Sequence, residues 1–68
     1  MRDIGSKIKA ERLLKGISQK ELADVLGVKQ NTVSEYEHNV RQPNYDLLVQ
    51  IADFFDVTTD YLLGRNDI

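Results

Sequence analysis

A short run of amide and hydroxyl side chains occupies residues 30–34, and these groups can make specific hydrogen bonds to another molecule. Gln30 and Asn31 each pair a donor with an acceptor, which matches the N6 and N7 edge of adenine in a DNA major groove. Ser34 lies about one helical turn further on and can touch a base or a phosphate. These residue types predict base contacts by Gln30, Asn31 and Ser34, with a merely solvated polar face as the alternative.

Glu35 follows this run, and its role has three interpretations. It can accept a hydrogen bond from a cytosine amino group, and it is a candidate base contact for that reason. It can instead repel phosphates and so restrict the permitted sequences, or it can be a solvated charge at the edge of the groove. We favour the last of these interpretations.

Two short helical patterns joined at one glycine must position these side chains. Ser18 and Glu21 have the spacing of a capping box, which places the start of the first of these helices at Gln19. Gly27 ends that helix and turns the chain into a second helix over residues 30–37. The apolar residues of the two helices and the turn between them are Leu22, Ala23, Leu26, Val28, Val33 and Tyr36. Residues 19–37 therefore have the pattern of a helix-turn-helix, which indicates sequence-specific DNA binding.

The whole chain predicts an all-α domain of five short helices without a sheet. The first helix spans about Asp3 to Lys15, while Asn44 and Thr58 are the N-caps of the fourth and fifth. Asn39 suits a left-handed residue after the third helix. The fourth helix is the most apolar element and the expected centre of the core, with Leu47, Leu48, Ile51, Ala52, Phe54 and Phe55.

Leu13 and Leu14 do not continue the apolar stripe of the first helix, which runs through Ile4 and Ile8. We favour the interpretation that one of these leucines packs under Ile17 and the loop that follows. The alternative is an exposed leucine that meets a protein partner.

Length and composition exclude several classes of protein. The 68 residues predict one domain over residues 1–68, and the absence of cysteine excludes a disulfide or a thiolate metal site. One histidine and no glycine-rich phosphate loop leave little from which to build an enzyme, a metal site or a cofactor site. No apolar run approaches the ~20 residues of a membrane span, and the N-terminus has no signal core, so we expect a cytoplasmic protein.

Charge is distributed unevenly along the chain, which has a net charge of −2. Residues 1–41 hold eight Lys and Arg against six acidic residues, a net of +2. Residues 42–68 hold Arg65 against five aspartates, a net of −4. The helix-turn-helix thus lies in the less acidic half, although charge alone would not predict a DNA partner.

Several separated motifs resemble the Xre/Cro-type helix-turn-helix family of phage repressors and bacterial transcriptional regulators. The matching segments are Gly16-Ile17-Ser18-Gln19-x-x-Leu22-Ala23, Gly27-Val28, Val33-Ser34-x-Tyr36-Glu37 and Val57-Thr58, followed by Tyr61-Leu62-Leu63-Gly64. The resemblance implies a compact five-helix, lambda-repressor-like domain whose third helix lies in the major groove. It also implies a homodimer on double-stranded DNA with a two-fold symmetric operator.

The sequence departs from the family pattern at three positions. Lys29 replaces a frequent Ser or Thr helix cap, and Asn39 replaces a common glycine. Glu11 stands where leucine is frequent, which concerns the core side of the first helix.

Residues outside the recognition helix also have expected roles. The resemblance implies that Arg12 and Glu37 form a partly buried ion pair of structural importance. The amides at the start of the second helix and the cations near it predict phosphate contacts by Ser18, Gln19, Lys20, Lys29, Arg41 and Asn44, with an ordinary surface residue as the alternative for each. The expected dimer surface includes Phe55, Val57, Tyr61, Arg65 and Ile68, with core packing as the alternative for Phe55 and Tyr61.

The leading hypothesis is a DNA-binding transcriptional regulator that acts as a repressor. The alternative is a protein-interaction module, such as an antitoxin or an anti-repressor that uses the same fold. The two leucines at positions 13 and 14 and the acidic second half of the chain motivate this alternative, and both roles can coexist.

Overall fold

The computed structural model describes residues 3–65, and all regular secondary structure within this range is helical. The helices are α1 (Ile4–Lys15), α2 (Gln19–Leu26), α3 (Gln30–Glu37), α4 (Tyr45–Phe55) and α5 (Thr59–Leu62). The expected all-α fold is therefore confirmed, with α1 beginning one residue later than predicted because Asp3 is its N-cap. Within the described range, no helix combines the length and apolarity needed to cross a membrane.

Local side-chain caps explain where most of these helices begin. Ser18 and Glu21 form both hydrogen bonds of the capping box at α2, and Asn44 and Thr58 cap α4 and α5 through their side-chain oxygens. Lys29 precedes α3 without a side-chain cap hydrogen bond. The start of α3 therefore depends on packing and on the turn before it rather than on a cap.

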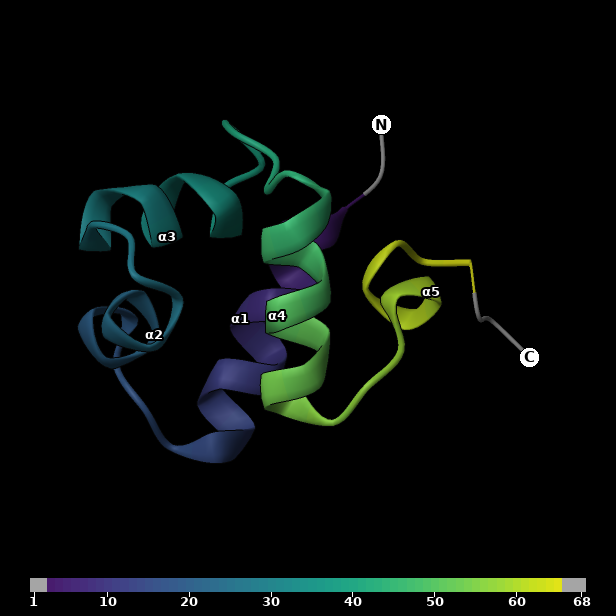
Figure 1. The fold of residues 1–68 in the computed structure, drawn as a ribbon, viewed down its shortest axis with the longest axis horizontal. Coiled ribbons are helices and arrows are strands. Elements are labelled where there is room, and N and C mark those ends of the chain that lie inside the picture. Colours follow the sequence, from purple (N-terminus) through teal and green to yellow (C-terminus); the bar gives the residue numbers. More distant parts are fainter. Residues whose placement is uncertain (1–2, 66–68) are drawn as a thin grey trace.

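Each helix contributes one large, fully buried side chain to the core: Ile8, Leu22, Val33, Ile51 and Leu62. In Figure 1, α2 and α3 lie on one side of α4 and α5 lies on the other, and α1 packs against α3, α4 and α5. This arrangement makes α1 and α4 the centre of the molecule. It leaves α3 at the surface, supported from inside by α1 and α2.

A close approach between α1 and α3 depends on glycine at position 5. A Cβ atom built on Gly5 would lie 2.4 Å from the backbone oxygen of Glu37 and 2.5 Å from that of Tyr36. Neither backbone oxygen can move without displacing the end of α3. Gly5 therefore fixes how closely the first helix supports the third, a role that the sequence pattern did not reveal.

The expectation that Leu13 or Leu14 packs under Ile17 is wrong. The two leucines are 59% and 80% exposed. The buried stripe of α1 continues from Ile8 to Arg12, and Arg12 Nη1 donates a 2.9 Å hydrogen bond to the Ile17 carbonyl. The side chain that contacts Ile17 is thus Arg12, where a leucine had been predicted.

Candidate nucleic-acid interface

A tight turn at Gly27 sets the angle between α2 and α3. Gly27 has a left-handed backbone with φ of 71°, and the amide of Val28 donates to the Ala23 carbonyl at 3.0 Å. Val28 is half-buried, and the next residue, Lys29, already precedes α3. The three-residue connection places α3 across α2 as a helix-turn-helix over residues 19–37.

The two sides of α3 differ sharply in burial. Val33 and Tyr36 are buried against the core, whereas Gln30 and Asn31 are exposed at the first turn of the helix. Ser34 is half-buried on the next turn. The side chains predicted to read bases are therefore accessible at the N-terminal end of α3, the end that enters a major groove in helix-turn-helix proteins.

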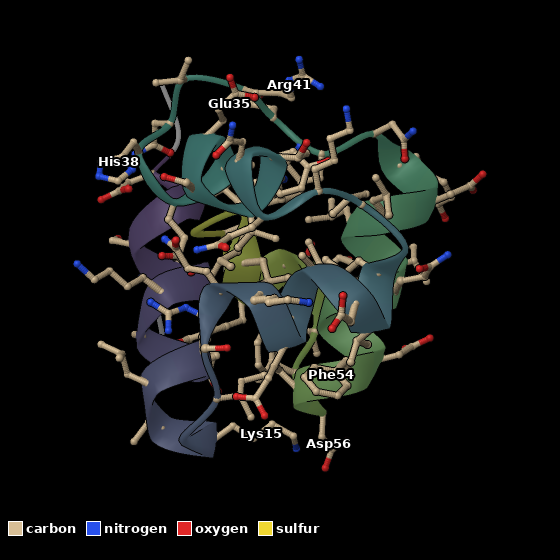
Figure 2. All side chains as sticks on the ribbon, turned by 90° about the vertical axis from the view of Figure 1, so that its left-hand side faces the viewer. Lys15, Glu35, His38, Arg41, Phe54 and Asp56 are labelled. Carbon is tan, nitrogen blue, oxygen red and sulfur yellow. The ribbon has the colours of Figure 1, made fainter. Side chains whose placement is uncertain are left out.

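Glu35 is paired with a cation rather than surrounded by solvent alone. Its Oε1 lies 3.2 Å from Arg41 Nε, and its backbone oxygen accepts from the amides of Val40 at 2.9 Å and Arg41 at 3.3 Å. Figure 2 shows Glu35 and Arg41 together at one edge of the molecule, with His38 on the same side. The loop after α3 is thus folded back onto the last turn of that helix.

An open groove of about 580 Å³ separates α3 from the start of α4. Three of the predicted phosphate contacts, Lys29, Arg41 and Asn44, line this groove together with Thr32 and Gln42. Its apolar wall is formed by Val28, Tyr36 and Leu47. Two cations and several amide or hydroxyl groups in an open groove match the chemistry of a phosphate backbone.

The buried Tyr36 forms part of the same groove. Burial raises the pKa of Tyr36 above its usual value, while the nearby positive charge of Arg41 opposes this rise. The phenol therefore stays protonated and able to donate a hydrogen bond at neutral pH.

The three predicted phosphate contacts at the start of α2 already have partners within the protein. Ser18 is occupied in the capping box, and Gln19 Nε2 donates to Glu37 Oε1 at 3.0 Å. Lys20 Nζ lies 3.4 Å from Asp24 in a pair whose side chains are about 70% exposed. Such an exposed pair is weak, so Lys20 can exchange Asp24 for a phosphate at little cost.

Arg12 and Glu37 form a buried ion pair between α1 and α3. Arg12 Nε lies 2.6 Å from Glu37 Oε2, and Nη2 donates to Oε1 at 3.3 Å. The Ile17 carbonyl and the Gln19 amide complete the network. Because it joins α1, the start of α2 and the end of α3, the pair fixes the position of α3 from the core side.

The expected dimer residues lie on α5 and next to it. Val57 and Tyr61 are half-buried, Arg65 is exposed, and Phe55 is buried in the core. Of these residues, Phe55 thus follows the core alternative. Ile68 lies outside the described residues.

Tyr61 makes a contact that explains an unusual residue of α1. Its hydroxyl donates to Glu11 Oε2 at 3.1 Å, and Lys7 Nζ lies 5.4 Å from the centre of its ring. The carboxylate acceptor raises the pKa of Tyr61 above its usual value. Glu11 therefore makes a polar contact between α1 and α5.

Asn39 also has a partner that the sequence did not reveal. It adopts the predicted left-handed conformation with φ of 60°. Its Oδ1 accepts from the Gly5 amide at 2.9 Å, and its Nδ2 donates to Asp3 at 2.8 Å. The end of α3 is thereby bonded to the start of α1, a contact between residues too far apart in sequence for a local pattern to show.

The candidate site consists of a polar surface on α3 and the cation-lined groove beside it. Within residues 3–65, no group of three or more His, Cys, Asp or Glu side chains is placed to hold a metal ion.

Comparison with known sequences finds one family and several regulators. Residues 8–62 match the family described as helix-turn-helix. The HTH-type transcriptional regulator ImmR of Bacillus subtilis (strain 168) is 37% identical over 65 residues, which cover 96% of this chain and 51% of ImmR. AnsR of the same organism is 43% identical over 54 residues, which cover 79% of this chain and 47% of AnsR. The chain thus spans about half the length of these relatives.

Two solved structures with bound DNA have the same fold. The P22 c2 repressor in complex with a synthetic operator matches with a TM-score of 0.88 and 27% identity, covering 97% of this chain and 100% of that one. SinR, described as a master regulator for biofilm formation, was also solved in complex with DNA. It matches with a TM-score of 0.79 and 36% identity, covering 88% of this chain and 97% of that one.

Proposed function

Because this chain belongs to the helix-turn-helix family, we propose that it is a sequence-specific DNA-binding transcriptional regulator that represses by occupying its operator. In this proposal α3 lies in the major groove, where Gln30 and Asn31 contact base edges with help from Ser34. The protein carries out no chemical reaction of its own. Its effect on transcription follows from where it binds.

The exposure of Gln30 and Asn31 at the start of α3 is the observation that carries this proposal. Amide side chains on the outer side of a helix-turn-helix are placed to read bases, and the adjacent groove offers Lys29 and Arg41 to phosphates. The DNA complexes of the P22 c2 repressor and of SinR support the same docking for this chain.

We further propose that two copies bind a two-fold symmetric operator in the cytoplasm. A single module of this kind covers only about 600–1,000 Å² of protein surface, and joining two half-sites multiplies their affinities. Val57, Tyr61 and Arg65 offer a mixed apolar and polar surface near α5 for the contact between copies. In this arrangement the operator has half-sites about one helical turn, ~34 Å, apart.

Selection of bound DNA from a random pool tests the proposed function. We expect the wild-type protein to select a palindrome, and Gln30→Ala and Asn31→Ala to relax the preference at one or two positions in each half-site by a factor of about ten. Lys9→Ala is the control, because Lys9 is an exposed residue of α1. Selection of no sequence by the wild-type protein, with the fold intact, contradicts the proposal.

Exposure of Leu13 and Leu14 supports a second function, binding of another protein as in an antitoxin or an anti-repressor. Two adjacent exposed leucines on α1 are candidates for a contact that excludes water. Purification from the native host tests this function. A stoichiometric partner that is lost in the variant Leu13→Ser/Leu14→Ser supports it, while a wild-type protein that purifies alone contradicts it.

A further inference from the structure

We propose that Glu35 and Arg41 act as one recognition unit, in which Glu35 selects a cytosine amino group while Arg41 binds the neighbouring phosphate. The inference rests on the proposed function, because both residues belong to the same DNA interface. It replaces the interpretation of Glu35 as a solvated charge.

The backbone, and not only the side chains, brings the two residues together. The Glu35 carbonyl accepts hydrogen bonds from the amides of Val40 and Arg41 at 2.9 and 3.3 Å. These bonds hold the start of the Arg41 side chain over the last turn of α3. The 3.2 Å contact between Arg41 Nε and Glu35 Oε1 therefore joins two groups that the loop already places side by side.

Glu35 and Arg41 can each form further hydrogen bonds while they remain in contact with one another. The closest contact of the pair joins Glu35 Oε1 to Arg41 Nε, which leaves Glu35 Oε2 and the two terminal amino groups of Arg41 able to bind other groups. The side chains are 41% and 60% exposed, so these groups can be reached from outside. A guanidinium has five N–H donors, and a carboxylate has lone pairs on both oxygens. Each residue can thus bind DNA without giving up the other.

The base that suits Glu35 follows from the donor pattern of the major groove. Guanine presents two acceptors there and thymine presents an acceptor and a methyl group, so neither offers a hydrogen to a carboxylate. Adenine presents its amino group beside the N7 acceptor, and the lone pair of N7 would repel the second oxygen of the carboxylate. Cytosine presents its amino group, and Glu is one of the side chains that accept from it.

Arg41 makes a carboxylate tolerable next to the DNA backbone. An unpaired Glu35 would add a negative charge close to phosphates, which repel it. With Arg41 in contact, the unit is neutral as a whole. Arg41 also lines the groove that contains Lys29 and Asn44, which is where a phosphate is expected.

Base preference in matched variants tests the inference. The operator selected by the wild-type protein is substituted at each position in turn, and binding is compared for Glu35→Gln, Arg41→Gln and the double variant. Lys29→Gln is the control, because it removes a cation from the same groove without touching Glu35. Circular dichroism verifies that each variant is folded, since loss of an exposed pair costs little stability.

We expect the wild-type protein to prefer cytosine at one position of each half-site by a factor of about ten or more. Glu35→Gln shifts this preference to adenine, because a Gln amide matches the adenine edge. Arg41→Gln weakens binding to every sequence and also lowers the cytosine preference. The double variant binds more tightly than Arg41→Gln alone, because the unpaired carboxylate is gone. Lys29→Gln weakens binding to every sequence and leaves the cytosine preference unchanged.

Two results overturn the inference while the proposed function stands. One is a Glu35→Gln variant that binds all sequences more tightly with the same base preferences, which would make Glu35 a repulsive charge and nothing more. The other is strict additivity of the two substitutions, which would mean that the residues act independently. Failure of the wild-type protein to select any DNA is a separate outcome, and it overturns the proposed function as well.

Discussion

Arg12 and Glu37 show how a single pair of residues can fix the position of a whole helix, α3. They are the charged residues buried in the described part of the core. Every buried side-chain nitrogen and oxygen atom in that part has a hydrogen-bond partner. A charge pair in this setting costs desolvation on both sides, so its benefit is the geometry that it imposes on α1 and α3.

Removing one member of this pair should destabilise the fold strongly. We expect Glu37→Leu to lower the free energy of unfolding by about 3–5 kcal/mol, because Arg12 would remain as an uncompensated buried charge. Urea denaturation followed by circular dichroism measures this loss. Arg12→Met/Glu37→Leu should recover a substantial part of the stability, since no charge is then buried. A Glu37→Leu variant as stable as the wild-type protein would contradict the role assigned to the pair.

Asn39, at the end of α3, is hydrogen-bonded to Asp3 and Gly5 at the start of α1, so the two helices are joined at these ends. Asp3 accepts hydrogen bonds from the Asn39 side chain and from Ser6, and these donors hold the pKa of Asp3 below its ordinary value of 3.8. The folded state therefore favours the ionised carboxylate. Asp3 contributes stability that is fully present above its ordinary pKa and is lost as the pH falls through the lower value in the folded state.

This linkage predicts a pH-dependent difference between two proteins. Melting temperatures of the wild-type protein and Asp3→Asn, measured from about pH 7 to about pH 2, should differ most at neutral pH and converge at the acidic end. Asn39→Gly provides the control, because glycine keeps the left-handed backbone while removing the side-chain donor. In that background the effect of Asp3→Asn should be smaller. If the two melting temperatures differed by the same amount at every pH, the ionised carboxylate of Asp3 would be excluded as the source of the extra stability.

Local rules predicted the helices well because each boundary depends on a few neighbouring residues. The capping box at Ser18 and Glu21 and the left-handed turn at Gly27 lie where the sequence placed them. The same rules placed Gln30 and Asn31 on the first turn of the third helix. Their exposure followed from the buried positions of Val33 and Tyr36 on the opposite side.

Contacts between distant residues were beyond these rules. Glu11 and Tyr61 are 50 residues apart, and no sequence period connects them. The same holds for Gly5 against the end of α3. Leu13 and Leu14 were misassigned because a buried arginine occupies the apolar stripe of α1, and hydrophobic periodicity does not anticipate a charged residue there.

The expected DNA surface, formed by α3 and the loop that follows it, lies at one end of the molecule. Figure 2 shows Glu35 and Arg41 at this end, while Lys15, Phe54 and Asp56 lie at the opposite end. Lys15 there is placed over the Phe54 ring, 5.0 Å from its centre. Cations on the two ends should therefore differ in their effect on DNA binding, although each contributes equally to the net charge.

The dependence of binding on salt tests this polarity. Lys20, Lys29 and Arg41 from two copies neutralise at most about six phosphates, which gives a log–log slope near −5. Because Arg41 binds a phosphate while it is paired with Glu35, we expect a slope near −5 for the wild-type protein, with Arg41→Gln weakening it by about 2. Lys29→Gln should weaken the slope by about 2, since a dimer then loses two cations. Lys15→Gln should leave the slope unchanged, because Lys15 lies at the opposite end from Arg41.

Fluorescence anisotropy of a labelled operator at several salt concentrations measures these slopes. If Lys15→Gln and Lys29→Gln changed the slope equally, an interface confined to the α3 end would be contradicted.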